Sequence, residues 1–130
     1  NWTSQPWTTQ ERIQQICRSM YRNAPDGLCG NDDCGQMSAW YIFSTLGFYP
    51  VCPGTTQYAI GSPSFSEASV FLSKGKKLSI RVYRQQEQDI YIQSVSHNGI
   101  PLQPTFLEHE ELEKGGELFF IMGPTPREWE

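Results

Sequence analysis

Two adjacent carboxylates and an amide stand on one short segment of this sequence. Asn31, Asp32 and Asp33 lie between Gly30 and Gly35, and glycine lets the backbone bend tightly at such positions. Glycoside hydrolysis needs a carboxylate that activates water and a carboxylic acid that protonates the leaving oxygen. Hard cations such as calcium bind carboxylate and amide oxygens. The segment therefore predicts a site for sugar cleavage, for calcium, or for both.

A purely structural interpretation of the same segment competes with this one. Asp33 is a good N-cap for a following helix, and Gln36 three residues later would complete a capping box. Asp32 would then be a solvated loop residue. The run also lacks the alternating oxygen ligands and the terminal glutamate of an EF-hand. The local pattern alone leaves both interpretations open.

A one-sided helix is predicted before the acidic segment. Apolar residues recur there with the i, i+3, i+4, i+7 spacing of a helix. They are Ile13, Ile16, Cys17 and Met20. Thr8 or Thr9 would cap this helix, and it should end near Asn23, because Pro25 disfavours helical geometry in the residue before it. The opposite, polar face would carry Gln14, Gln15, Arg18 and Arg22.

A second helix is predicted from about Gly35 to Leu46, with its end at Gly47. It is apolar almost all round, which is typical of a helix buried on several sides, as in a layered helical barrel. Its apolar residues are Met37, Ala39, Trp40, Tyr41, Ile42, Phe43 and Leu46. One other helix cannot cover all these faces. We therefore expect a larger helical domain beyond this sequence.

After Pro50 the pattern changes to that of short strands. The predicted strands are Gln57–Ile60, Ala68–Leu72, Lys77–Tyr83, Ile90–Val95 and Glu117–Met122. Asn98-Gly99 predicts a type I′ hairpin turn, and Glu108–Lys114 a short helix or turn. The fold class is thus α+β, with two helices in residues 1–50 and an antiparallel sheet or sandwich in residues 51–130.

Composition excludes several classes of function. The net charge is -4, from 10 Lys+Arg and 14 Asp+Glu, and no basic stripe favours nucleic acid. No apolar run reaches the ~20 residues that would span a membrane. The sequence opens without methionine, so we expect a mature or truncated fragment. Its four cysteines fit no zinc template, and we expect buried free thiols, or a disulfide if the protein is exported. They are Cys17, Cys29, Cys34 and Cys52.

Ordered motifs along the whole sequence resemble glycoside hydrolase family 92. The longer ones are NWTSQPW at 1–7, DGLCGNDDCGQMSAWY at 26–41 and LGFYP at 46–50. Shorter ones are TQ at 9–10, IGSP at 60–63, HE at 109–110, KGG at 114–116 and MG at 122–123. The stretch between residues 27 and 40 matches at a dozen ordered positions, which is far more specific than a three-letter motif.

The resemblance implies a calcium-dependent, inverting exo-α-mannosidase, common in gut Bacteroidetes, that removes terminal mannose from glycans, with α-1,2 linkage as the first expectation. Such enzymes combine a β-sandwich with an (α/α) barrel. Residues 1–50 would be the last barrel helices with the active-site loop, and residues 51–130 the β-rich C-terminal portion. The chain would then be inactive without the rest of its polypeptide. A periplasmic or cell-surface location in a bacterium is also implied.

For individual residues the resemblance implies a general base at Asp32 or Asp33, and either could also bind calcium. The general acid and several calcium ligands would lie in sequence outside this chain. Capping by Asp33 would favour Asp32 as the base. Asn31, Trp2 and Trp7 are candidate substrate contacts, although packing between helices is an equal expectation for both tryptophans.

A second hypothesis is a non-catalytic, carbohydrate-binding β-sandwich led by two linker helices. It requires exposed aromatic side chains on one strand face, and Tyr83 and Tyr91 are the candidates. A purely structural brace for the barrel is a third hypothesis for residues 51–130, and it is compatible with the first.

Overall fold

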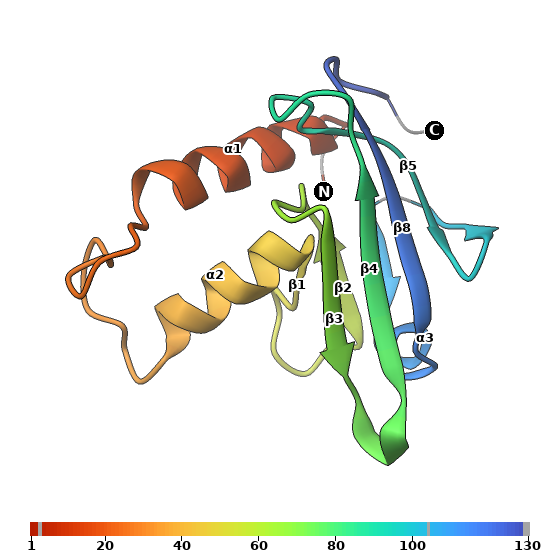
Figure 1. Cartoon of the computed structure of the whole chain (residues 1–130), viewed down its shortest axis with the longest axis horizontal. Helices are drawn as coiled ribbons and strands as arrows, with labels where there is room; N and C mark the ends of the chain where they lie inside the picture. The colour runs from red at the N-terminus through yellow and green to blue at the C-terminus, as the bar shows by residue number, and fades with distance from the viewer. Residues whose placement is uncertain (3, 104, 129–130) are drawn as a thin grey trace.

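Two long helices and one short helix accompany two β-sheets in the computed structural model, which describes residues 1–2, 4–103 and 105–128 (Figure 1). The helices are α1 (Pro6–Ser19), α2 (Gln36–Leu46) and the short α3 (His109–Glu113). The strands are β1 (Phe48–Tyr49), β2 (Gln57–Ile60), β3 (Glu67–Phe71), β4 (Lys77–Tyr83), β5 (Tyr91–His97), β6 (Ile100–Pro101), β7 (Phe106–Glu108) and β8 (Gly116–Gly123). A 3-10 turn, Ser73–Gly75, joins β3 to β4.

Helix α1 begins and ends earlier than predicted. It starts at Pro6, whose fixed φ and missing N–H suit the first helical position, and no side chain caps it. Thr8 and Thr9 therefore lie inside the helix, and the prediction that either one caps it is wrong. The helix stops at Ser19 rather than near Asn23, because the chain turns away there.

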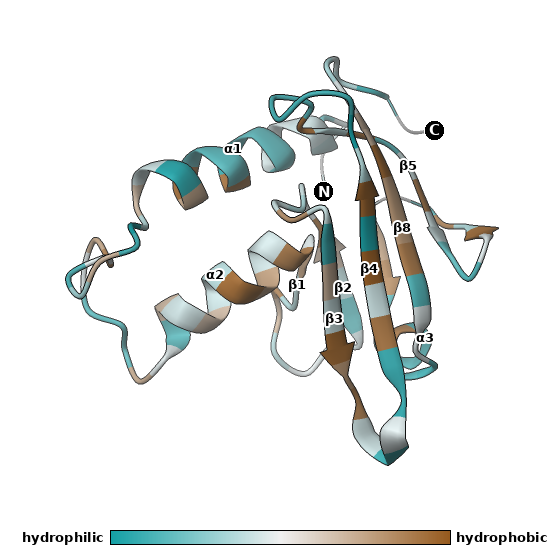
Figure 2. Ribbon diagram, viewed as in Figure 1, coloured by the Kyte–Doolittle hydropathy of each residue, from teal (hydrophilic) through white to brown (hydrophobic). Residues whose placement is uncertain are grey.

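Two glutamines attach α1 to the sheets. The Gln10 side-chain oxygen accepts a hydrogen bond from the Ile92 N–H of β5 at 2.9 Å, and Gln14 donates to the Ser62 carbonyl at 2.9 Å. Both glutamines are buried, whereas Met20 of the expected apolar face is exposed. The prediction that Gln14 lies on the solvent face of the helix is therefore wrong. The side-chain amides of Gln10 and Gln14 attach this side of α1 to the sheets through hydrogen bonds and not through apolar contacts. Figure 2 shows how hydrophilic most of α1 is.

Helix α2 matches its predicted range to within one residue. Gly47 ends it with a φ of 102°, the left-handed conformation that glycine adopts readily. Ser44 and Thr45 are its buried residues, and Ile42 is 57% exposed. The described residues of this chain therefore do not bury α2 on several sides.

The strands form a three-stranded sheet, β1-β2-β7, and a five-stranded sheet, β3-β4-β8-β5-β6. All pairs are antiparallel except β4 and β8, which run parallel, so the prediction of a wholly antiparallel sheet is wrong there. Parallel neighbours need a long crossover, and the chain from β5 to α3 supplies it. The predicted bounds of β2 and β4 are confirmed. Strands β1, β6 and β7 were not predicted, because two or three residues are too few to show alternation.

The predicted hairpin at Asn98-Gly99 is confirmed. These residues join β5 to β6 with φ values of 52° and 79°, and a type I′ turn needs positive φ at both.

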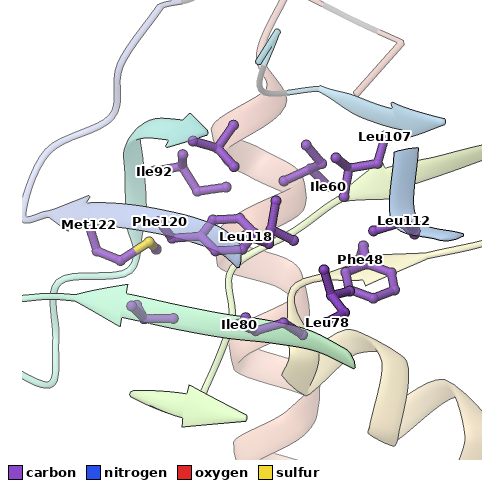
Figure 3. Packing of buried hydrophobic residues seen from close by; sticks show 12 residues of the cluster. Phe48, Ile60, Leu78, Ile80, Ile92, Leu107, Leu112, Leu118, Phe120 and Met122 are labelled. Atoms are coloured by element: carbon purple, nitrogen blue, oxygen red, sulfur yellow. The ribbon is translucent and has the colours of Figure 1, made fainter. Parts of the chain in front are cut away.

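One apolar core joins the two sheets. Leu78, Ile80 and Val82 of β4 are buried, as their alternation predicts. Figure 3 shows Leu118 and Phe120 of β8 at the centre of the cluster, and both are 0% exposed. Phe48 and Ile60 contribute from the three-stranded sheet, and Phe43 and Leu46 of α2 pack against the same core. The C-terminal end of α2 is thereby anchored, while its N-terminal end points away from the sheets (Figure 1).

The junction between α2 and the core gives a stability prediction. A Cβ at Gly47 would lie 3.1 Å from the Pro63 Cβ and 3.3 Å from the Phe120 ring, and φ is positive there. We expect Gly47→Ala to lower the free energy of unfolding by about 2 kcal/mol, from left-handed strain plus crowding. Gly54→Ala is the control, because Gly54 has a φ of 90° but no atom within 4 Å of its Cβ position. Equal losses in urea unfolding of the two variants would show that crowding at Gly47 contributes nothing.

Candidate active site

The acidic segment lies at the N-terminal end of α2, far from the sheets (Figure 1). Its backbone turns sharply just before the helix: Asp33, Cys34 and Gly35 have φ values of 51°, 59° and 95°. Two successive non-glycine residues in the left-handed region cost free energy, and such strain concentrates at functional sites. The segment therefore forms a tight turn with a defined backbone conformation and not an extended loop.

Asp32, and not Asp33, contacts the first turn of α2. Its Oδ1 accepts hydrogen bonds from the Ser38 N–H at 2.8 Å and from the Ser38 hydroxyl at 3.0 Å. Its carbonyl oxygen accepts a further bond from the Met37 N–H at 3.1 Å. The side chain is half-buried, and Oδ2 has no hydrogen-bond partner among the described residues. One oxygen is thus held and the other is free.

The predicted N-cap at Asp33 is wrong. The residue in the cap position is Gly35, and no side chain caps it in the usual geometry. Because left-handed residues precede Gln36, the carboxylate that reaches the helical N–H groups comes from Asp32, one residue earlier. Asp33 is exposed, and its carboxylate makes no hydrogen bond or ion pair to any described residue.

An aromatic group, which the sequence reasoning missed, flanks this turn. The Tyr21 hydroxyl donates to the Met37 carbonyl at 3.0 Å, and the Tyr21 ring packs on Trp40 and Tyr41 at 5.9 and 4.7 Å between centroids. Burial, with smaller contributions from nearby acidic groups that include Asp32, raises the pKa of Tyr21. Tyr21 therefore stays neutral at physiological pH. No periodic signal marks it, because it lies between the helices.

A pocket of about 460 Å³ adjoins the turn. Its lining residues are Tyr21, Arg22, Asn23, Ala24, Pro25, Gly27, Leu28, Ser38, Tyr41 and Ile42. Small-molecule sites have volumes of roughly 300–1,000 Å³, so the hollow is large enough for a sugar ring. Ser38 lines the pocket and also binds the Asp32 carboxylate, whereas Asp32 itself is not a lining residue.

The other predicted substrate contacts are not brought together. Asn31 is exposed beside Asp32. Trp2 packs edge-on against Phe106 with 5.0 Å between ring centroids, and Trp7 is the second residue of α1. The start of α1 lies at the opposite end of the helix pair from the acidic turn (Figure 1). The structure therefore separates both tryptophans from Asp32.

The residues of this turn do not complete a calcium site by themselves. Across the described residues, no group of three or more His, Cys, Asp or Glu side chains could hold a metal ion. Calcium takes about six to eight oxygen ligands. Asp32, Asp33 and Asn31 supply two carboxylates and one amide at most.

The four thiols are free, and their burial differs from the prediction. Cys17 is buried between α1 and the sheets, and burial raises the pKa of its thiol to about 11. The other three cysteines are exposed, so the prediction of buried thiols is wrong for Cys29, Cys34 and Cys52. All three lie in loops outside the core.

The tyrosines of the carbohydrate-binding hypothesis have different surroundings. Tyr83 is 55% exposed at the end of β4. The Tyr91 hydroxyl donates to the Glu11 carboxylate of α1, and this bond is the main reason why the pKa of Tyr91 is raised. Tyr91 thus serves to attach α1 to β5.

Residues 1–124 match the family model described as the glycosyl hydrolase family 92 catalytic domain. The chain belongs to glycosyl hydrolase family 92. This finding confirms the resemblance carried by the sequence motifs and the α+β fold class.

Three relatives place this family 92 chain in context. A family GH92 α-mannosidase from Bacteroides thetaiotaomicron, solved in complex with mannoimidazole, has a TM-score of 0.88 and 38% identity over 94% of this chain. A family GH92 inverting mannosidase from Bacteroides thetaiotaomicron VPI-5482 has a TM-score of 0.85 and 41% identity over 95% of this chain. An uncharacterized secreted glycosidase from Arthroderma benhamiae is 26% identical over 99% of this chain.

The family 92 chain spans a small part of these relatives. It covers 16% and 17% of the two solved mannosidases and 17% of the fungal glycosidase. No described helix is long and apolar enough to cross a membrane.

Proposed function

We propose that this chain is the C-terminal part of a larger exo-acting α-mannosidase, in which Asp32 is the general base. The observation that carries the proposal is the arrangement of its carboxylate. Ser38, which lines the pocket, holds Oδ1 with two hydrogen bonds, while Oδ2 has no hydrogen-bond partner among the described residues. A base needs a fixed carboxylate with one oxygen available for a proton. The Asp33 carboxylate is exposed and has no hydrogen-bond partner among the described residues, so it is not fixed in this way.

The proposed reaction inverts the anomeric centre. Oδ2 of Asp32 accepts a proton from a water molecule as that water attacks the anomeric carbon, and a carboxylic acid on the other face protonates the leaving oxygen. In inverting enzymes the two carboxyl groups stand ~6.5–9.5 Å apart to leave room for the water. The acid comes from the remainder of the polypeptide, which also covers the exposed face of α2. The inverting relative supports this mechanism.

Calcium, location and linkage belong to the same proposal. The free Asp33 carboxylate is suited to contribute an oxygen ligand to calcium, with Asp32 as the alternative, and other ligands come from outside this chain. The relative described as secreted supports a site outside the cytoplasm, and the Bacteroides relatives support the periplasm or surface of a bacterium. The substrate is a mannose-containing glycan, with an α-1,2 linkage.

The stereochemical outcome tests the proposed function. We expect the larger enzyme to release β-mannose first from α-1,2-mannobiose, as followed by proton NMR before the anomers equilibrate. The 130-residue chain alone should release none, because the proposed general acid comes from the rest of the polypeptide. Release of α-mannose would contradict inversion, and hydrolysis by the isolated chain would contradict the missing acid.

A further inference from the structure

We infer that Ser38 is a positioning residue for the base, because its hydroxyl and N–H fix the Asp32 carboxylate with Oδ2 directed to the reacting water. This inference rests on the proposed function and assigns Ser38 a role that acts through Asp32.

The two contacts of Ser38 converge on one atom. The N–H donates to Asp32 Oδ1 at 2.8 Å and the hydroxyl donates to the same oxygen at 3.0 Å. Ser38 is the third residue of α2, where backbone N–H groups have no partner within the helix. Two bonds to Oδ1 restrict the rotation of the carboxylate and thereby limit the directions that Oδ2 can take. The α2 dipole adds a favourable field for the negative charge.

The hydroxyl contact exceeds what capping requires. The Ser38 N–H is already satisfied by Asp32, and the Gln36 and Met37 N–H groups bond to the Asp33 and Asp32 carbonyls. The helix start is therefore complete without the hydroxyl. The hydroxyl bond acts on the carboxylate itself, and hydrogen bonds to a charged acceptor stabilise the charged form.

The titratable groups around Asp32 are few among the described residues. Tyr21 packs beside the turn from the loop after α1, and its raised pKa keeps it neutral. Cys29 and Asp32 both contribute to the raised pKa of Tyr21, so both lie near the Tyr21 ring. Asp33 follows Asp32 in the sequence. The exposed Arg22–Asp26 ion pair borders the pocket. A change confined to Ser38 therefore acts on the Asp32 charge and leaves the others in place.

The test compares Ser38→Ala with Ser38→Thr in the larger enzyme. We expect Ser38→Ala to lower kcat about ten-fold with an unchanged KM, because one bond to a charged group is lost. Ser38→Thr keeps the hydroxyl and should restore kcat. Ser44→Ala is the matched control, because Ser44 lies on the same helix and its buried hydroxyl has no partner among the described residues.

The outcomes separate this inference from the proposed function. Wild-type kcat and KM in Ser38→Ala, with an inactive Asp32→Asn variant, would overturn the positioning role alone. Wild-type turnover in Asp32→Asn would overturn the base assignment instead. If Ser38→Ala fails to fold, Ser38→Cys keeps a similar volume with a weak donor, and wild-type kcat in that variant overturns the inference. A lowered melting temperature with wild-type kcat and KM would also leave Ser38 a merely structural role.

Discussion

Asp32→Asn is expected to lower kcat of the larger mannosidase about a thousand-fold, the effect of losing a general base. Asparagine still accepts both hydrogen bonds from Ser38, so the turn before α2 should keep its shape. The amide cannot take a proton from water at neutral pH, however. The loss should therefore fall on kcat, and KM should change little. Steady-state kinetics on α-mannobiose measure both.

Asp33→Asn is the matched control for this variant. It removes the same charge one residue away, from a carboxylate that contacts no described residue. We expect its kcat to fall far less than that of Asp32→Asn, unless calcium is limiting. Kinetic assays with excess calcium ensure that calcium binding does not limit the measured kcat. An inactive Asp33→Asn variant together with an active Asp32→Asn variant would assign the general base to Asp33 instead of Asp32.

Phe120→Ala is expected to lower the free energy of unfolding of the 130-residue chain by about 4 kcal/mol. Phe120 is 0% exposed, and it lies at the centre of the core between the two sheets (Figure 3). Its ring also approaches Gly47, so it supports the end of α2. The lost ring leaves a cavity that neighbours on both sheets cannot fill. Urea unfolding followed by tryptophan fluorescence measures the change.

Phe71→Ala is the control for the core prediction. Phe71 is the same residue type on β3, but it is 83% exposed. Removing an exposed side chain changes stability by about 0.5 kcal/mol or less. A loss of stability as large as that of Phe120→Ala would place the core elsewhere than between the two sheets.

The elements that the sequence predicts well are those with a long, clear pattern. Seven alternating residues predict β4, and Gly47 marks the end of α2. Alternation cannot show whether a neighbouring strand runs parallel or antiparallel, so the β4–β8 pair could not be foreseen. The buried face of α1 was misjudged because Gln10 and Gln14 contact backbone groups of segments far away in the sequence.

The candidate site was found in the sequence, but its internal arrangement was not. The glycines and acids of residues 30–35 identify the turn. The left-handed conformation of Asp33 and Cys34 could not be read from residue type, since aspartate adopts it only occasionally and cysteine rarely. The carboxylate that bonds to the first turn of α2 was therefore assigned to Asp33 instead of Asp32. Ser38 was missed because a serine on the first turn of a helix is common and usually has no role in a site.

A crystal structure of the larger enzyme with a non-hydrolysed mannose analogue would show directly whether Asp32 is the general base. We expect a water within about 3 Å of Asp32 Oδ2, facing the anomeric carbon, with Oδ1 still bonded to Ser38. A second carboxyl group from outside residues 1–130 should stand ~6.5–9.5 Å from Asp32 on the other side of that carbon. A water held by a different carboxylate, with Asp32 turned away from the sugar, would rule out Asp32 as the base.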